Sequence, residues 1–202
     1  AVRVFGRVVK RFPQHPLAAS SAQLLLEALR ERRKSAAVAT WLRRLRRGAV
    51  AKHHPSLAKL LGKVSLRRAF RRGQEASAAK RWRRCVEAFA RVAKRAQTGE
   101  ALRPMALHNG ALCAQRGKDK RAAKLWSQLL EEHAAHPLAQ RARYALAAMH
   151  HQARRHERAA ELYEAFARRA PKNDGEAAQG LLYAITVRVR KRDKARAKAL
   201  LS

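Results

Sequence analysis

A small alanine followed by an aromatic residue four positions later recurs along the chain. The pairs are Ala37–Trp41, Ala78–Trp82, Ala122–Trp126 and Ala159–Tyr163. The large apolar residue returns at intervals of 36, 41, 44, 37 and 37 residues, at Phe5, Trp41, Trp82, Trp126, Tyr163 and Leu200. Residues four apart lie on one face of a helix, and self-similarity at this period indicates stacked helical repeats. We expect the two longer intervals to contain extended loops, at residues 48–55 and 98–104.

A second small residue precedes several of these pairs. Gly110 lies twelve residues before Ala122, Ala147 lies twelve before Ala159, and Ala184 lies twelve before Arg196. Small residues at such positions allow two helices to cross closely. The aromatic residue one turn later would then fill the space between neighbouring helix pairs. Each repeat would bury its apolar face only against the next repeat.

The composition is typical of an all-α chain. Hydrophobic residues make up 47%, while aromatic residues make up only 5%. No stretch alternates apolar and polar residues long enough to indicate a sheet. Prolines at positions 13, 55, 104, 137 and 171 fit the breaks between predicted helices, because proline is tolerated before or within a first turn but not in the middle of a helix. The predicted helices cover residues 1–12, 17–30, 35–48, 56–72, 75–96, 104–116, 119–133, 138–153, 156–170, 175–191 and 193–201.

These residues resemble the tetratricopeptide repeat (TPR) family. The series Ala147, Ala159, Tyr163, Pro171 fits its pattern best, and the series Gly110, Gly117, Ala122, Trp126 comes next. The segments 12–18 and 133–139 are similar to linkers of the bacterial envelope-type members. The resemblance implies one domain over residues 1–202, a right-handed solenoid of antiparallel helix pairs with about 11 helices. Two features depart from the pattern: no repeat has a tryptophan near the start of its first helix, and Leu25 and Leu66 stand where a small residue is expected.

The charge is extreme, with 47 Lys and Arg against 14 Asp and Glu, or +33 with neutral histidine. Such a surplus attracts polyanions. Basic runs occur in almost every repeat, so the alternative is that they coat the solvent faces of helices. A third explanation is deliberate replacement of surface residues to raise the charge. Trp41, Trp82 and Trp126 fall at the repeat's packing position, and we expect them in the core rather than on a base-stacking surface.

No pattern indicates catalysis. The chain has no phosphate-binding glycine loop and no H-E-x-x-H motif. His150, His151 and His156 cluster in sequence, but no cysteine or carboxylate completes a metal-ligand set at suitable spacing. Cys85 and Cys113 lie 28 residues apart in apolar helical stretches, and we expect both to be free and packed as small hydrophobic residues. We therefore predict a binding protein that is not an enzyme and has no cofactor or metal.

The family's usual binding surface is the concave wall of the solenoid. The resemblance places nine residues there: Arg30, Lys63, Arg67, Arg71, Arg141, Tyr144, His151, Gln152 and Arg188. A basic groove suits an acidic protein or peptide partner, because guanidinium groups match carboxylates. The alternative is a nonspecific nucleic-acid or polyanion-binding repeat, and a third hypothesis is an accessory domain of a larger enzyme.

The compartment and the oligomeric state stay open. No apolar run reaches the length of a membrane span, and the start of the chain has neither a signal-peptide pattern nor an initiating methionine. We expect the chain to be a fragment of a larger protein from the bacterial periplasm or cytoplasm.

Overall fold

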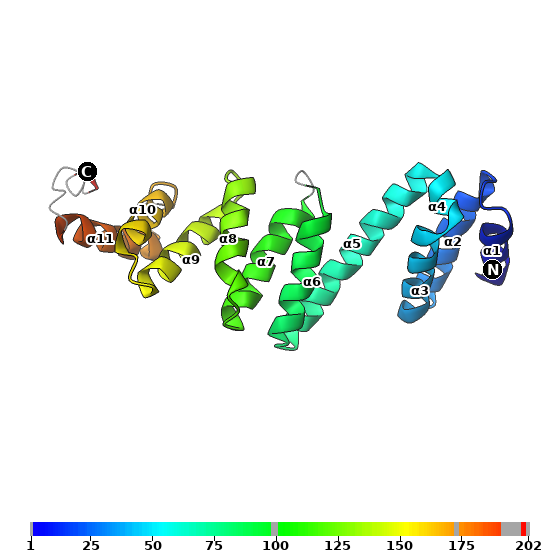
Figure 1. The fold of residues 1–202 in the computed structure, drawn as a ribbon, viewed down its shortest axis with the longest axis horizontal. Coiled ribbons are helices and arrows are strands. Elements are labelled where there is room, and N and C mark those ends of the chain that lie inside the picture. Colours follow the sequence, from blue (N-terminus) through cyan, green and yellow to red (C-terminus); the bar gives the residue numbers. More distant parts are fainter. Residues whose placement is uncertain (1, 98–100, 172–173, 191–198, 201–202) are drawn as a thin grey trace. The chain divides into compact units, whose positions relative to one another are not determined.

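The computed structural model describes residues 2–97, 101–171, 174–190 and 199–200, and within these residues it contains eleven helices and no strand (Figure 1). The helices are α1 (Val2–Arg11), α2 (Leu17–Glu31), α3 (Ser35–Arg47), α4 (Ala49–His53), α5 (Pro55–Ala78), α6 (Trp82–Arg95), α7 (Leu102–Arg116), α8 (Arg121–Glu132), α9 (Leu138–Gln152), α10 (His156–Ala167) and α11 (Gly175–Arg190). The predicted all-α class is confirmed for this part of the chain, and successive helices pack on one another. No helix among the described residues could cross a membrane.

The predicted helix boundaries were wrong in two places. Residues 48–55 were expected to form a loop, but Ala49–His53 forms α4 between Gly48 and Pro55. The next two helices were expected over 56–72 and 75–96, but α5 continues to Ala78 and α6 begins only at Trp82, because residues 74–78 are mostly good helix formers. The eleventh predicted helix, over 193–201, falls almost entirely outside the described residues.

The chain divides into two compact units within α5, Ala1–Arg68 and Ala69–Ser202, which we describe separately. The expectation of a single domain stays a prediction. In the first unit, the hydrophobic core gathers side chains from α1 to α5: Val9, Ala18, Ala22, Leu42, Leu45, Val50, Leu57 and Leu61. Trp41 is half-buried beside this core, and its ring packs on Gly6 of α1, where an added Cβ would lie 3.0 Å away.

In the second unit, the aromatic residue of the repeat packs against glycines of neighbouring helices. An added Cβ would lie 2.8 Å from the ring of Phe89 at Gly73 and 3.2 Å from the Phe89 Cβ at Gly110. At Gly180 it would lie 2.7 Å from the ring of Tyr163. The aromatic side chains can approach these helices so closely only because glycine has no side chain at these positions. The prediction that the aromatic fills the space between neighbouring helices is confirmed at Tyr163, whereas Phe89 packs in the same way at a position that the predicted repeat assigned to Trp82.

The predicted repeat register was wrong around Trp82. Ala78 ends α5 and Trp82 begins α6, so this alanine and this tryptophan do not share one helix. Cys85 and Phe89 take the small and aromatic positions instead, and they are 0% and 1% exposed. Trp82 is only half-buried, whereas Trp126 is 1% exposed and lies in the core as predicted.

The same turn geometry recurs at four helix–helix connections. Arg33, Lys80, Lys118 and Arg154 each have a positive φ, between 50° and 57°. After each of them, the next backbone N–H reaches back five residues, as Arg155 N does to His150 O at 2.9 Å. This six-to-one hydrogen bond is the Schellman motif that ends a helix. The turns thus repeat in structure although their residues differ.

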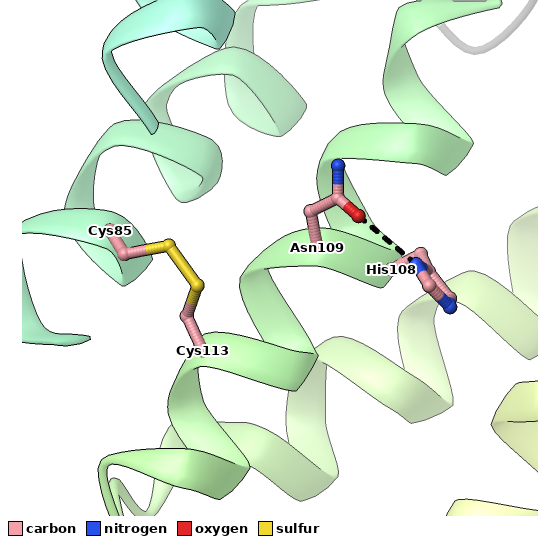
Figure 2. The surroundings of a disulfide bond; sticks show 4 residues. All are labelled: Cys85, His108, Asn109 and Cys113. Atoms are coloured by element: carbon pink, nitrogen blue, oxygen red, sulfur yellow. Dashed lines mark hydrogen bonds between the residues drawn. A yellow bond between two sulfur atoms is a disulfide. The ribbon is translucent and has the colours of Figure 1, made fainter. Parts of the chain in front are cut away.

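The expectation of two free cysteines was wrong. Cys85 of α6 and Cys113 of α7 form a disulfide, with their Cα atoms 6.1 Å apart (Figure 2). The two helices pack closely where Phe89 meets Gly110, and this packing brings the two cysteines opposite each other. Sequence spacing alone could not show that these two positions face each other across the interface between two helices.

A partly buried arginine also links three helices of the second unit. Arg103 at the start of α7 donates to both carboxylate oxygens of Glu132 in α8, at 2.6 and 2.9 Å. It also donates to the carbonyls of Ala93 and Ala96 at the end of α6. Bidentate, charge-assisted hydrogen bonds of this kind hold both partners in one geometry.

Candidate partner-binding surface

Four of the predicted groove residues lie on α9, and two of them line a hollow between α9 and α10. His151, Gln152 and Ala148 form its α9 side. Arg154 from the turn, and His156 and Tyr163 from α10, complete the lining of a space of about 500 Å³. We call this the α9–α10 hollow. The hollow is open to solvent, so it suits a side chain of a larger partner better than an enclosed small molecule.

A row of rings extends from the hollow over three helices. The His151 ring lies 4.0 Å from the Tyr183 ring of α11, measured between centroids. Tyr183 also contacts Tyr163 at 5.4 Å, and Tyr163 contacts Tyr144 at 5.8 Å. The His156 Nδ1 and the Tyr183 hydroxyl lie 2.7 Å apart in a hydrogen bond. These contacts pack the rings that line the hollow against Tyr144 of α9 and Tyr183 of α11.

The phenols of Tyr163 and Tyr183 stay protonated at neutral pH, because the pKa of each is raised. Burial raises the pKa of Tyr163, and the neighbouring Tyr144 and Tyr183 raise it further. Burial also raises the pKa of Tyr183, although Arg190 opposes the shift. A neutral phenol can donate a hydrogen bond. The neutral Tyr183 hydroxyl thus holds the His156 ring by its hydrogen bond, and the exposed guanidinium groups of Arg154 and Arg155 are the donors that match a carboxylate.

The surroundings of the hollow are basic. Arg154 and Arg155 are exposed at the turn. The pKa of His150 is lowered, first by burial and then by the positive charges of Arg155 and Arg158. Arg158 pairs with Glu161 at 2.8 Å, but both side chains are largely exposed, so this pair is weak. The field at the hollow favours an anionic group.

The remaining predicted groove residues have different surroundings. Arg141 is exposed and lies 3.6 Å from the Glu176 carboxylate of α11. Arg188 is buried instead, and its Nε donates to Glu164 at 3.0 Å. That contact ties α11 to α10, so Arg188 has a structural role in this arrangement. Arg30, Lys63 and Arg67 are exposed in the first unit, and Arg71 is exposed in the second.

Sequence reasoning missed several residues of this surface. Arg154 was not selected, although its position in a tight turn exposes it. His156 was noticed only as part of a possible metal cluster, and Tyr163 only as a packing residue. Tyr183 carries no repeat signal at all. No group of three or more metal-ligating side chains occurs within the described ranges.

Comparison of the sequence with known proteins found no matching family model and no matching curated protein. The resemblance to the TPR family therefore rests on the residues of this chain alone.

Proposed function

We propose that this chain is a TPR-like scaffold, a right-handed solenoid of antiparallel helix pairs that binds an acidic peptide or helix of a protein partner at the α9–α10 hollow. The four repeated turns and the aromatic-on-glycine packing support the repeat architecture. The anionic character of the partner follows from the charge of +33 and from the donors around the hollow.

One observation carries the binding proposal. His151 and Gln152 were selected from the repeat pattern alone, and both line the same hollow with Arg154, His156 and Tyr163. An acidic segment could place an apolar or aromatic side chain in the hollow and a carboxylate near Arg154. Anchors of this kind dominate the binding energy of many interfaces.

Peptide selection tests the proposal with an unidentified partner. A random peptide library displayed on phage would be selected against the full chain at about 200 mM salt, where nonspecific charge attraction is weak. We expect acidic peptides with a bulky apolar residue. Their affinity should fall at least tenfold in the double variant Arg154→Gln/Arg155→Gln, since a charge-assisted hydrogen bond contributes roughly 1.5–3 kcal/mol.

The matched control is Lys94→Gln/Arg95→Gln, which removes the same charge from exposed positions at the end of α6. Equal loss of affinity in both double variants would show that only net charge matters. That outcome would support the alternative function, a nonspecific polyanion-binding repeat. Under this alternative, binding is indifferent to peptide sequence and falls steeply with salt.

The disulfide indicates in which cellular compartment the protein folds. Disulfides persist in oxidising compartments and are rare in the cytoplasm of mesophiles. The Cys85–Cys113 bond therefore supports the periplasmic alternative. Alkylation of protein from its native source, without a reductant, followed by mass spectrometry tests this inference. Two alkylated cysteines in the native protein would contradict it.

A further inference from the structure

Trp82 is an aromatic residue that does not belong to the buried core. Phe89 occupies the packing position of its repeat and is 1% exposed, whereas Trp82 is half-buried at the first residue of α6. Gly117, in the turn after α7, holds the base of the Trp82 side chain. An added Cβ there would lie 2.7 Å from the Trp82 Cβ. The tryptophan is thus fixed at its base, and part of its surface meets solvent.

Arginines surround this tryptophan. The Arg116 guanidinium lies over the Trp82 ring, 5.8 Å from its centroid. Arg81, Arg83 and Arg84 are exposed and, together with Trp82, line a hollow of about 580 Å³. We call these five residues the Trp82 platform.

The ion pair between Glu87 and Arg83 neutralises little of the platform's charge. Glu87 lies 3.4 Å from Arg83, but the two side chains are 40% and 88% exposed. It also lies 3.8 Å from Arg91. Exposed pairs of this kind contribute little and exchange readily for another anion. The platform therefore keeps a strong positive charge beside a flat ring.

We propose that the Trp82 platform binds single-stranded nucleic acid. A base would stack on the planar surface made by Trp82 and Arg116, and the adjoining phosphates would pair with Arg81 and Arg84. Sites for single strands combine these two elements, an aromatic stacking surface and a basic track for the backbone. An acidic peptide could satisfy the guanidinium groups but has no regular set of flat rings for the stack. The platform lies on α6 and α7, apart from the α9–α10 hollow, so this site and the proposed function can fail independently.

Fluorescence anisotropy with a labelled oligothymidylate of about 15 nucleotides tests the proposal on the full chain, since this length spans known single-strand sites. We expect Trp82→Leu to weaken binding about tenfold, the cost of losing one stacked base. The double variant Arg81→Gln/Arg84→Gln should lower the slope of log affinity against log salt by about 1.4, because each lost phosphate contact on a single strand removes about 0.7. Circular dichroism would confirm that each variant remains folded.

The control Lys94→Gln/Arg95→Gln lies at the other end of α6 and should leave the affinity and the slope near those of the unsubstituted chain. The proposal is overturned if the two double variants behave alike, or if Trp82→Leu binds as tightly as the unsubstituted chain. It is also overturned if a polyglutamate peptide competes as well as an unlabelled oligonucleotide of equal charge. Photocrosslinking of the unsubstituted chain to an iodouridine-containing oligonucleotide provides a readout that needs no variant. The peptide containing Trp82 must be among the crosslinked ones.

Discussion

The buried ion pair between α10 and α11 gives a sharp test of the packing. The Arg188 Nε donates to the Glu164 carboxylate at 3.0 Å, and the two side chains are 9% and 2% exposed. Arg168 also lies 3.9 Å from this carboxylate, but it is 69% exposed and contributes little. Glu164→Leu would therefore leave the Arg188 guanidinium buried without its main anionic partner. Breaking a buried pair in this way costs about 3–5 kcal/mol.

Replacing both partners has a different consequence. In Glu164→Leu/Arg188→Met, neither buried charge remains, and apolar side chains of similar volume fill the space. Such replacements are often neutral or stabilising. The double variant should therefore be more stable than the single variant by about 3 kcal/mol or more, although it carries more substitutions.

Urea unfolding followed by far-ultraviolet circular dichroism measures both variants. In thermal unfolding, the single variant should lose roughly 10–20 °C in melting temperature for a unit of this size. Arg188→Met alone should also be destabilised, because it leaves the Glu164 carboxylate buried. The reasoning is refuted if Glu164→Leu stays within about 1 kcal/mol of the unsubstituted chain, or if the double variant is as unstable as the single one.

Three further predictions concern the packing, the disulfide and the pH dependence. Gly180→Ala should destabilise the chain by roughly 1–3 kcal/mol in urea unfolding, because the added methyl group would lie 2.7 Å from the Tyr163 ring. Gly62 has open space around it, so Gly62→Ala should stabilise its helix by about 0.5–1 kcal/mol. Destabilisation by both would contradict the packing argument. Replacing both disulfide cysteines with alanine should cost about 3–4 kcal/mol, the loop entropy for a separation of 28 residues, and an unchanged urea midpoint would contradict this estimate. Burial, partly opposed by the Asn109 hydrogen bond, lowers the pKa of His108 below 6.5. The unfolded chain therefore binds more protons than the folded chain, and the free energy of unfolding should fall as the pH drops from about 7 to 5. His108→Gln should flatten this decrease, and a profile as steep as before would exclude His108 as its cause.

The sequence predicted the helices well where a local signal existed. The segments 17–31, 138–152 and 156–167 were placed within a few residues, because prolines and tight basic turns mark their ends. The predicted end of α5, at residue 72, fell just before Gly73. Gly73 instead lies inside a helix, where the ring of Phe89 needs the space.

The candidate site could be predicted only in part. His151 and Gln152 follow from the repeat position of α9, which local spacing reveals. Tyr183 and the disulfide depend on which residues of separate helices face each other, and no spacing along one helix carries that information. The burial of Arg188 likewise depends on a carboxylate 24 positions earlier in the chain.

Hydrogen exchange with a phage-selected acidic peptide tests the central claim most directly. The account predicts that the peptide slows amide exchange in residues 148–156 of α9 and α10 and around Tyr183, while α2 and α3 keep their rates. Protection spread evenly over all helices, or confined to the first unit, would contradict the assignment of the partner site to the α9–α10 hollow.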